Sequence, residues 1–218
     1  KKIFIERYGQ DQFDAITGDE ADAHFKLGVE YSELGKYEEA IEAYKQAIGI
    51  EPDDAEAHYN LGNAYIDSGK YKEAIESYKQ AIRINPDDAH AHINLGFAYD
   101  ELGEYDEAIK SYKQAISICP NDAYAHNNLG YTYDNLGKYE EAIESYKQAI
   151  RIDPDYALAH YNLACSYSSL GNVSKALESL GKAIDSGYDD IKHMENDSDL
   201  NGLRDEAGYK KLINKLKS

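Results

Sequence analysis

The sequence predicts an all-α fold, a solenoid of stacked antiparallel helix pairs, and three observations support this. The pentapeptide YKQAI occurs at residues 44–48, 78–82, 112–116 and 146–150, always at an interval of 34 residues. A proline and a glycine keep the same interval, at Pro52, Pro86, Pro120 and Pro154 and at Gly28, Gly62, Gly96 and Gly130. Apolar residues follow a helical spacing in both halves of each period. A fixed period of this length is typical of stacked supersecondary units.

Residues 55–88 illustrate the elements of one repeat. The stretch AEAHYNLGNAYID predicts a first helix, and KYKEAIESYKQAIRI predicts a second. Gly69 lies in the short turn between them, where glycine can take a left-handed conformation. Pro86 prevents the second helix from continuing, and Asp87 or Asp88 can cap the first helix of the next repeat.

Small residues are expected where the two helices of a repeat cross. Gly62 and Ala74 remove bulk at the crossing, while Leu61, Tyr65 and Tyr78 fill the layer between repeats. One helix pair cannot bury these faces alone, so each repeat needs its neighbours.

The spacing of Leu61-Gly62, Tyr65, Gly69, Tyr71, Ala74, Tyr78, Ala81 and Pro86 resembles the tetratricopeptide repeat. The resemblance implies a right-handed superhelix of five repeats over residues 21–190, namely 21–54, 55–88, 89–122, 123–156 and 157–190. The fifth repeat departs from the pattern, with Ala164, Leu180 and Tyr188 in place of glycine, tyrosine and proline. Residues 191–218 are predicted to form a C-terminal helical cap over the last repeat.

Residues 1–20 do not fit the repeat and are treated as an N-terminal segment. Their apolar side chains, such as Ile3, Phe4 and Tyr8, need cover. The segment could form a cap, lie along the first repeat, or dock into a neighbouring molecule, which would make a homo-oligomer.

Composition excludes several classes of function. The net charge of −18, from 23 basic and 41 acidic residues, repels nucleic-acid phosphates and anionic membrane surfaces. No apolar run is long enough to span a bilayer. Cys119 and Cys165 form neither a disulfide framework nor a metal pair, which favours the cytoplasm. The chain does not begin with Met, so a trimmed leader or an excised fragment stays open.

Histidines recur at the fourth place of each repeat, at His24, His58, His92, His126 and His160. Equivalent atoms of packed helices lie about 10 Å apart, whereas metal ligands must lie about 2 Å from their ion. We therefore expect these rings to pack between repeats with one nitrogen hydrogen-bonded. A phosphate-binding loop, a nucleophile elbow and an HExxH helix are all missing. The sequence predicts no enzyme activity, catalytic residue, cofactor or metal site.

The family resemblance implies that the first helices line a concave groove that binds a peptide or protein. Asparagines at the sixth place either pair with a peptide backbone or bond to neighbouring helices, and both interpretations stay open. Aromatic residues at the fifth and ninth places are expected to anchor apolar side chains. The candidate binding residues are Tyr59, Asn60, Asn63, Asn94, Phe97, Asp100, Asn128, Tyr131, Tyr161 and Asn162.

The predicted partner carries basic and apolar residues. Acidic residues at the twelfth and thirteenth places are concentrated in the first four repeats and missing from the fifth, where Leu158 and Tyr161 make the groove more apolar. The clamp by which similar repeats hold a chaperone's C-terminal carboxylate is incomplete, because Tyr59, Tyr124 and Asn128 replace its cations. The alternatives to an interaction scaffold of this kind are self-assembly through the N-terminal segment and service as the targeting domain of a larger enzyme.

Overall fold

The computed structural model describes the backbone of residues 10–217 and the side chains of residues 20–217. Throughout this range the chain consists of helices and short turns without a strand. It divides after Glu104 into two compact units, called here the N-terminal unit and the C-terminal unit. The three alternatives for the cover of Ile3, Phe4 and Tyr8 lie outside the described residues.

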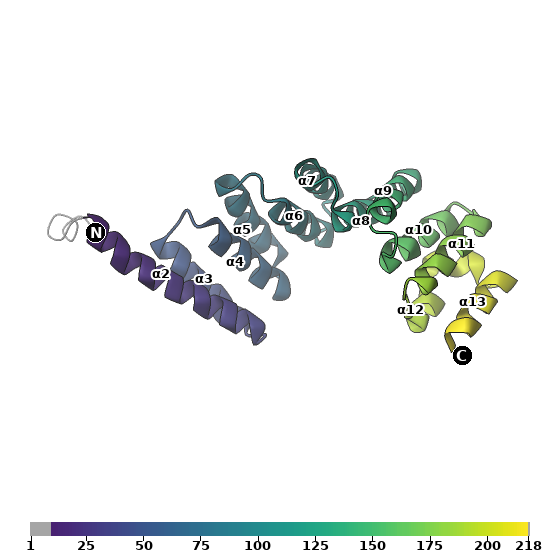
Figure 1. Ribbon diagram of the computed structural model, residues 1–218, viewed down its shortest axis with the longest axis horizontal. Coiled ribbons are helices and arrows are strands. Elements are labelled where there is room, and N and C mark those ends of the chain that lie inside the picture. Colours follow the sequence, from purple (N-terminus) through teal and green to yellow (C-terminus); the bar gives the residue numbers. More distant parts are fainter. Residues whose placement is uncertain (1–9, 218) are drawn as a thin grey trace. The chain divides into compact units, whose positions relative to one another are not determined.

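The N-terminal unit consists of helix pairs in chain order. Helix α2 packs against α3 and α4 against α5, while α3 also contacts α4 and α5 contacts α6 (Figure 1). Contacts also join α4 directly to α2 and α6, so the first helices of these repeats share one side of the unit. The helix bounds are α2 Gln10–Glu33, α3 Tyr37–Ile50, α4 Ala55–Asp67, α5 Tyr71–Ile84 and α6 Ala89–Glu101.

Helix α2 begins well before Ala21, where the first repeat was predicted to start. It runs from Gln10 to Glu33 without a break, so residues 10–20 continue the first helix of the first repeat. The departure of these residues from the repeat pattern therefore does not interrupt the helix.

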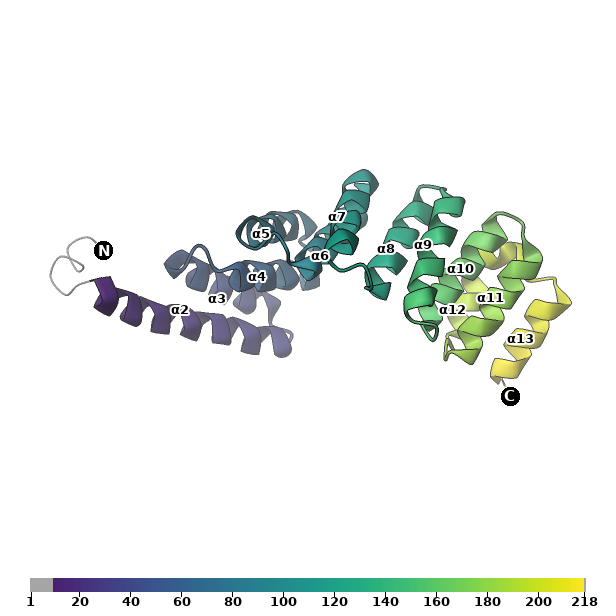
Figure 2. The same cartoon turned by 45° about the horizontal axis from the view of Figure 1, so that its top comes forward.

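The C-terminal unit continues the same arrangement and ends in shorter elements. Helix α8 packs against α9 and α10 against α11, and α8 and α10 are in direct contact (Figure 2). The bounds are α7 Tyr105–Ile118, α8 Ala123–Asn135, α9 Tyr139–Ile152, α10 Ala157–Ser169, α11 Val173–Asp185, α12 Ile191–Asn196, the 3-10 helix η1 Ser198–Leu203, and α13 Ala207–Lys217.

Turns and caps follow the local sequence signals. Gly69 has a φ of 70°, the left-handed conformation that the turn after α4 was expected to need. The Asp88 side chain accepts hydrogen bonds from the backbone N–H groups of His90 and Ala91, and so caps α6. Of the two predicted capping residues, Asp88 is therefore the one that caps the helix.

The core of each repeat is built on a tyrosine that fills the space left by a glycine. Tyr78 is fully buried, and a Cβ atom added to Gly62 would lie 2.5 Å from its Cε1 atom. The same relation joins Gly130 to Tyr146. The glycine in α4 is thus required by the tyrosine in α5, which explains why both keep the 34-residue interval.

Residues 191–217 cover the last helix pair. Met194, Leu200 and Leu203 are fully buried and join the core formed by α10 and α11. Helix η1 contacts both α10 and α11, and α13 contacts α11. This covering layer adds a wall beside α10, and that wall forms part of the candidate site.

Candidate functional site

Asn94 joins α6 to α4 in the N-terminal unit. Its Nδ2 donates hydrogen bonds to Asn63 Oδ1 at 2.9 Å and to the Tyr59 hydroxyl at 3.1 Å. The Tyr78 hydroxyl donates to the same Asn63 oxygen at 2.7 Å. Both amide hydrogens of Asn94 are therefore used inside the fold. Of the two interpretations of the asparagine ladder, bonding between helices describes this amide.

The remaining candidates of the N-terminal unit are Asn60, Phe97 and Asp100. Asn60 Nδ2 donates to the Glu56 carbonyl at 3.0 Å, one turn earlier in α4. Phe97 and Asp100 are half-buried on α6. These three side chains offer a partner only part of their surface.

In the C-terminal unit an amide again joins two first helices. Asn162 Nδ2 on α10 donates to Asn127 Oδ1 on α8 at 3.1 Å, and Asn127 Nδ2 donates to Asn128 Oδ1 at 3.4 Å. Asn127 is buried, although its fifth place was expected to be open. Asn128 Nδ2 is buried without a hydrogen-bond partner among the described residues.

The two candidate tyrosines of this unit differ in exposure. Tyr131 on α8 is 52% exposed, as expected for a groove residue, whereas Tyr161 on α10 is 2% exposed. Tyr188 stacks on Tyr161 with ring centroids 4.2 Å apart and an interplanar angle of 8°. The expectation of an open ring at Tyr161 is thus corrected, because the segment after α11 covers it. Its hydroxyl still faces a cavity.

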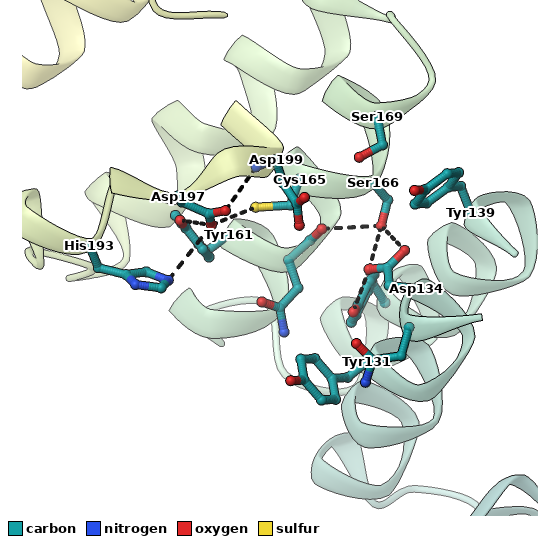
Figure 3. A pocket seen from close by; sticks show the side chains of 13 residues that line it. Tyr131, Asp134, Tyr139, Tyr161, Cys165, Ser166, Ser169, His193, Asp197 and Asp199 are labelled. Atoms are coloured by element: carbon teal, nitrogen blue, oxygen red, sulfur yellow. Dashed lines mark hydrogen bonds and ion pairs between the residues drawn. The ribbon is translucent and has the colours of Figure 1, made fainter. Parts of the chain in front are cut away.

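That cavity is the candidate site, and we call it the α8–α10 pocket (Figure 3). It has a volume of about 350 Å³ and lies between α8, α9, α10 and the segment from α12 to η1. Three of the predicted residues, Tyr131, Tyr161 and Asn162, line it. The others in its lining are Asp134, Asn135, Tyr139, Tyr146, Cys165, Ser166, Ser169, His193, Asp197 and Asp199.

Asp134 is a largely buried carboxylate on one side of the pocket. Tyr146 donates a hydrogen bond to its Oδ2 at 2.8 Å, and the Ser166 hydroxyl lies 2.9 Å from each of its oxygens. Burial raises the pKa of Asp134 from 3.8 to about 6, although both hydrogen bonds act in the opposite direction. Neutral donors thus hold a carboxylate whose charge is not balanced by a cation.

Asp197 forms the opposite side, as Figure 3 shows. Its Oδ2 accepts a hydrogen bond of 2.5 Å from Tyr161 and lies 3.6 Å from the Cys165 sulfur and 3.7 Å from His193 Nε2. Its Oδ1 accepts the backbone N–H of Asp199 at 2.9 Å. Burial and the neighbouring Asp197 also raise the pKa of Asp199. Negative charge therefore gathers on this side as well.

One group of side chains has the spacing of metal ligands. Among the described residues, one ligand atom from each of Cys165, Asp197 and Asp199 lies within 4.8 Å of the others. Burial and the nearby carboxylates raise the pKa of the Cys165 thiol well above its usual value, so the thiol stays protonated. Both oxygens of Asp197 already accept hydrogen bonds. The protonated thiol is not the thiolate ligand that a metal ion needs.

Family comparison agrees with the repeated architecture. The model described as "TPR repeat" matches residues 28–67, 62–103, 98–137 and 133–171, and the one described as "Tetratricopeptide repeat" matches residues 157–186. The chain is a tetratricopeptide repeat (TPR) protein. A search among curated proteins gives no significant match.

Solved structures of TPR proteins resemble this chain over most of its length. A crystal structure of MamA is 31% identical with a TM-score of 0.70, over 73% of this chain and 94% of that one. YrrB, titled "a TPR protein with an unusual peptide-binding site", is 28% identical with a TM-score of 0.68, over 84% and 95%. A thermophilic TPR protein of Thermus thermophilus is 27% identical with a TM-score of 0.62, over 79% and 94%.

Membership of the TPR family confirms the predicted all-α solenoid and implies a scaffold for protein–protein interaction. The family and these neighbours are typically interaction modules without catalysis. Within residues 10–217, no helix has both the length and the apolar character needed to cross a membrane.

Four of the histidines at the fourth place of the repeats have one ring nitrogen hydrogen-bonded, as predicted. Nε2 of His58, His92 and His160 lies 3.0, 3.2 and 2.9 Å from the carbonyl oxygen of the proline six residues earlier, and His126 repeats the contact at 3.1 Å. A carbonyl can only accept, so Nε2 must carry the proton. Each ring thus ties a first helix to the loop before it.

The sequence predicted three of the thirteen residues that line the pocket and missed the others. His193, Asp197 and Asp199 come from the segment after the last repeat, and no periodic position points to them. The twelfth and thirteenth places of the fifth repeat carry no acid, as read from the sequence, but this segment brings other carboxylates beside α10. Asp134, where repeat 55–88 has Ile66, was the available signal in the repeats.

Proposed function

We propose that this TPR protein binds a segment of a partner protein on the side formed by its first helices, with the α8–α10 pocket as the main anchoring point. The observation that carries the proposal is the pocket itself, where exposed Tyr131 lines a cavity with carboxylates on both sides. An exposed tyrosine beside a cavity is the kind of residue that dominates binding energy in protein interfaces. The proposed binding residues remain Tyr59, Asn60, Asn63, Asn94, Phe97, Asp100, Asn128, Tyr131, Tyr161 and Asn162.

These residues have different roles in the proposal. Tyr131 contacts an apolar side chain of the partner. Tyr161 and Asn162 contribute polar atoms to the floor of the pocket. The residues of α4 and α6 offer a further contact surface within the N-terminal unit, but their hydrogen bonds to one another leave fewer polar atoms for a partner.

The charge of the chain supports a basic partner. The net charge is −18, and among the described residues neither a lysine nor an arginine lines the pocket. Complementary charge accelerates association and selects among partners. The similarity to YrrB, whose title mentions a peptide-binding site, supports the use of peptides as probes.

The test is a screen of immobilised peptides against the parent chain and two variants. Tyr131→Ala removes the exposed ring of the pocket, and Leu34→Ala is the control, because Leu34 is 62% exposed but does not line the pocket. We expect peptides captured by the parent to be retained by Leu34→Ala and lost by Tyr131→Ala at unchanged helicity. Equal capture by both variants would overturn the proposal.

A further inference from the structure

We infer that the α8–α10 pocket binds an arginine side chain of the partner. The inference rests on the proposed function, since it names the chemistry of the residue that the pocket accepts. Three properties of the described residues support it: the balance of charge, the hydrogen-bonding groups already in use, and the aromatic residue at the pocket.

The first property is charge without compensation. Asp134, Asp197 and Asp199 line the pocket, and the other lining side chains are neutral apart from His193, which is half-exposed. Arg204 does not line the pocket, and its guanidinium donates to the backbone carbonyl of Asp197 at 2.8 Å. Elsewhere on the described surface some carboxylates have cationic partners: Glu38 pairs with Lys70 at 2.6 Å, and five further Asp or Glu residues outside the pocket pair with a lysine within the same helix. Three carboxylates beside one cavity without a lysine or arginine attract an external cation.

The second property is that the pocket carboxylates accept side-chain hydrogen bonds from neutral donors. Asp134 accepts from Tyr146 and Ser166, and Asp197 accepts from Tyr161, all of which are neutral donors. Neutral donors fix the orientation of the carboxylates but do not neutralise them. A cationic donor would add the attraction between opposite charges to a hydrogen bond with the same oxygens.

The arrangement of the carboxylates favours arginine over lysine. Asp134 lies on one side of the pocket, and Asp197 with Asp199 lies on the other (Figure 3). A guanidinium group has five N–H donors spread over a plane, so it can serve acceptors on two sides at once. An ammonium group is a compact and strongly hydrated charge, which loses more on entering a cavity.

The third property is the exposed ring of Tyr131. It lines the pocket and is 52% exposed, so it offers one face to an entering side chain. Guanidinium groups stack on aromatic rings, and the aliphatic part of arginine packs against apolar surface. Tyr161 cannot serve in this way, because Tyr188 already stacks on it.

A metal ion is the competing occupant, and the contacts disfavour it. The Cys165 thiol is buried and lies beside Asp197, whose charge opposes formation of a thiolate. The arginine proposal needs neither a thiolate nor the loss of the bond between Tyr161 and Asp197. A chelator present throughout the test removes any contribution from metals.

The test is an NMR titration of the full chain with three small probes. N-acetyl-argininamide carries the proposed group, N-acetyl-lysinamide carries the other cation, and N-acetyl-citrullinamide is the neutral analogue of arginine with nearly the same shape. We expect argininamide to shift the amide signals of α8, α10 and η1, the citrulline analogue to leave them unchanged, and lysinamide to bind several-fold more weakly.

Two variants locate the binding. Asp199→Asn removes one pocket carboxylate with little change in shape, and Asp189→Asn is the matched control, because Asp189 is an exposed residue that does not line the pocket. Asp199→Asn should weaken argininamide binding about tenfold, as expected for the loss of a charge-assisted contact. Asp189→Asn should leave the affinity unchanged.

Equal binding of arginine and citrulline probes, equal binding of lysine and arginine probes, or equal affinities of the two variants would each overturn the inference. Shifts spread over the whole acidic surface would also overturn it. These outcomes are separate from failure of the proposed function, because Tyr131-dependent capture of peptides without an arginine preference would leave that function standing.

Discussion

The two units use the same buried tyrosine to support two different kinds of polar group. Tyr78 in α5 and Tyr146 in α9 occupy equivalent places 68 residues apart (146 − 78), and both rings are fully buried against a glycine. The Tyr78 hydroxyl donates to the Asn63 amide, whereas the Tyr146 hydroxyl donates to the Asp134 carboxylate. One acceptor is neutral, and the other is a carboxylate whose pKa burial raises to about 6.

This difference shows how a repeated framework can carry a local site. The second helices present a hydroxyl at a constant place, because YKQAI and its facing glycine recur. The first helices supply the acceptor of the hydrogen bond that this hydroxyl donates. In the N-terminal unit the polar groups of the first helices form hydrogen bonds with one another. In the C-terminal unit they line a pocket with excess negative charge.

The largest expected effect comes from breaking the framework that the units share. Gly62→Leu and Gly130→Leu would each place a Cβ atom 2.5–2.6 Å from a buried tyrosine ring. Overpacking of this kind should cost about 3 kcal/mol in free energy of unfolding, measured by urea denaturation. The costs should be similar in the two units, because the ring contacts are the same.

Gly49→Leu is the control for these glycines. Gly49 lies within α3, and a Cβ atom there would meet nothing within 4 Å. Leucine has a higher helix propensity than glycine, so the variant should be stabilised by about 0.5–1 kcal/mol. A loss of stability at Gly49 equal to that at Gly62 would show that the tyrosine contact is not the cause.

The next effect separates the two units. Tyr146→Phe removes a hydrogen bond to a buried charge and should cost about 2 kcal/mol at pH 7, whereas Tyr78→Phe should cost about 1 kcal/mol. Asn63 keeps its bond from Asn94 in the second variant, which limits the loss. Parallel urea titrations measure the difference, and equal costs would contradict the contrast between carboxylate and amide.

The smallest effect concerns the pH dependence of stability. The pKa of Asp134 is about 6 in the folded chain and 3.8 without burial, so between these values the folded state binds more protons than the unfolded state. The free energy of unfolding of the parent should therefore fall as pH rises through this window. Asp134→Asn lacks this titration, and its stability relative to the parent should rise by about 1 kcal/mol between pH 4 and pH 7.

The measurement that checks this is a pair of urea titrations of Asp134→Asn and the parent at the two pH values. Asp155→Asn is the control, because Asp155 is exposed and its substitution should leave the pH dependence of the parent intact. A constant difference between Asp134→Asn and the parent at both pH values would show that burial does not perturb this carboxylate.

The repeats themselves could be predicted almost completely from the sequence. The stretch AEAHYNLGNAYID became α4 residue for residue, and the second helix begins one residue after Lys70 and ends at Ile84, before Pro86. Both boundaries depend on local chemistry, namely a capping aspartate, a left-handed glycine and a proline. Local signals of this kind can be recognised in one repeat, and they recur in the others.

The candidate site could be predicted only in part, because it depends on contacts between elements that share no pattern. Tyr131 and Asn162 follow from their places in the repeat, but Tyr161 is buried by Tyr188, which stands where the other repeats have proline. Asp197 reaches the pocket because Met194 and Leu200 pack on the last repeat. The sequence supplies those apolar residues but not the path of the chain between them.

The most direct test of the account is hydrogen exchange of the parent chain with and without a captured peptide. If the α8–α10 pocket is the main anchoring point, the peptide should slow exchange most in α8, α10 and residues 191–203, and less in α4 and α6. Protection confined to α4 and α6 would contradict the account, because it would place the partner on side chains that already form hydrogen bonds with one another.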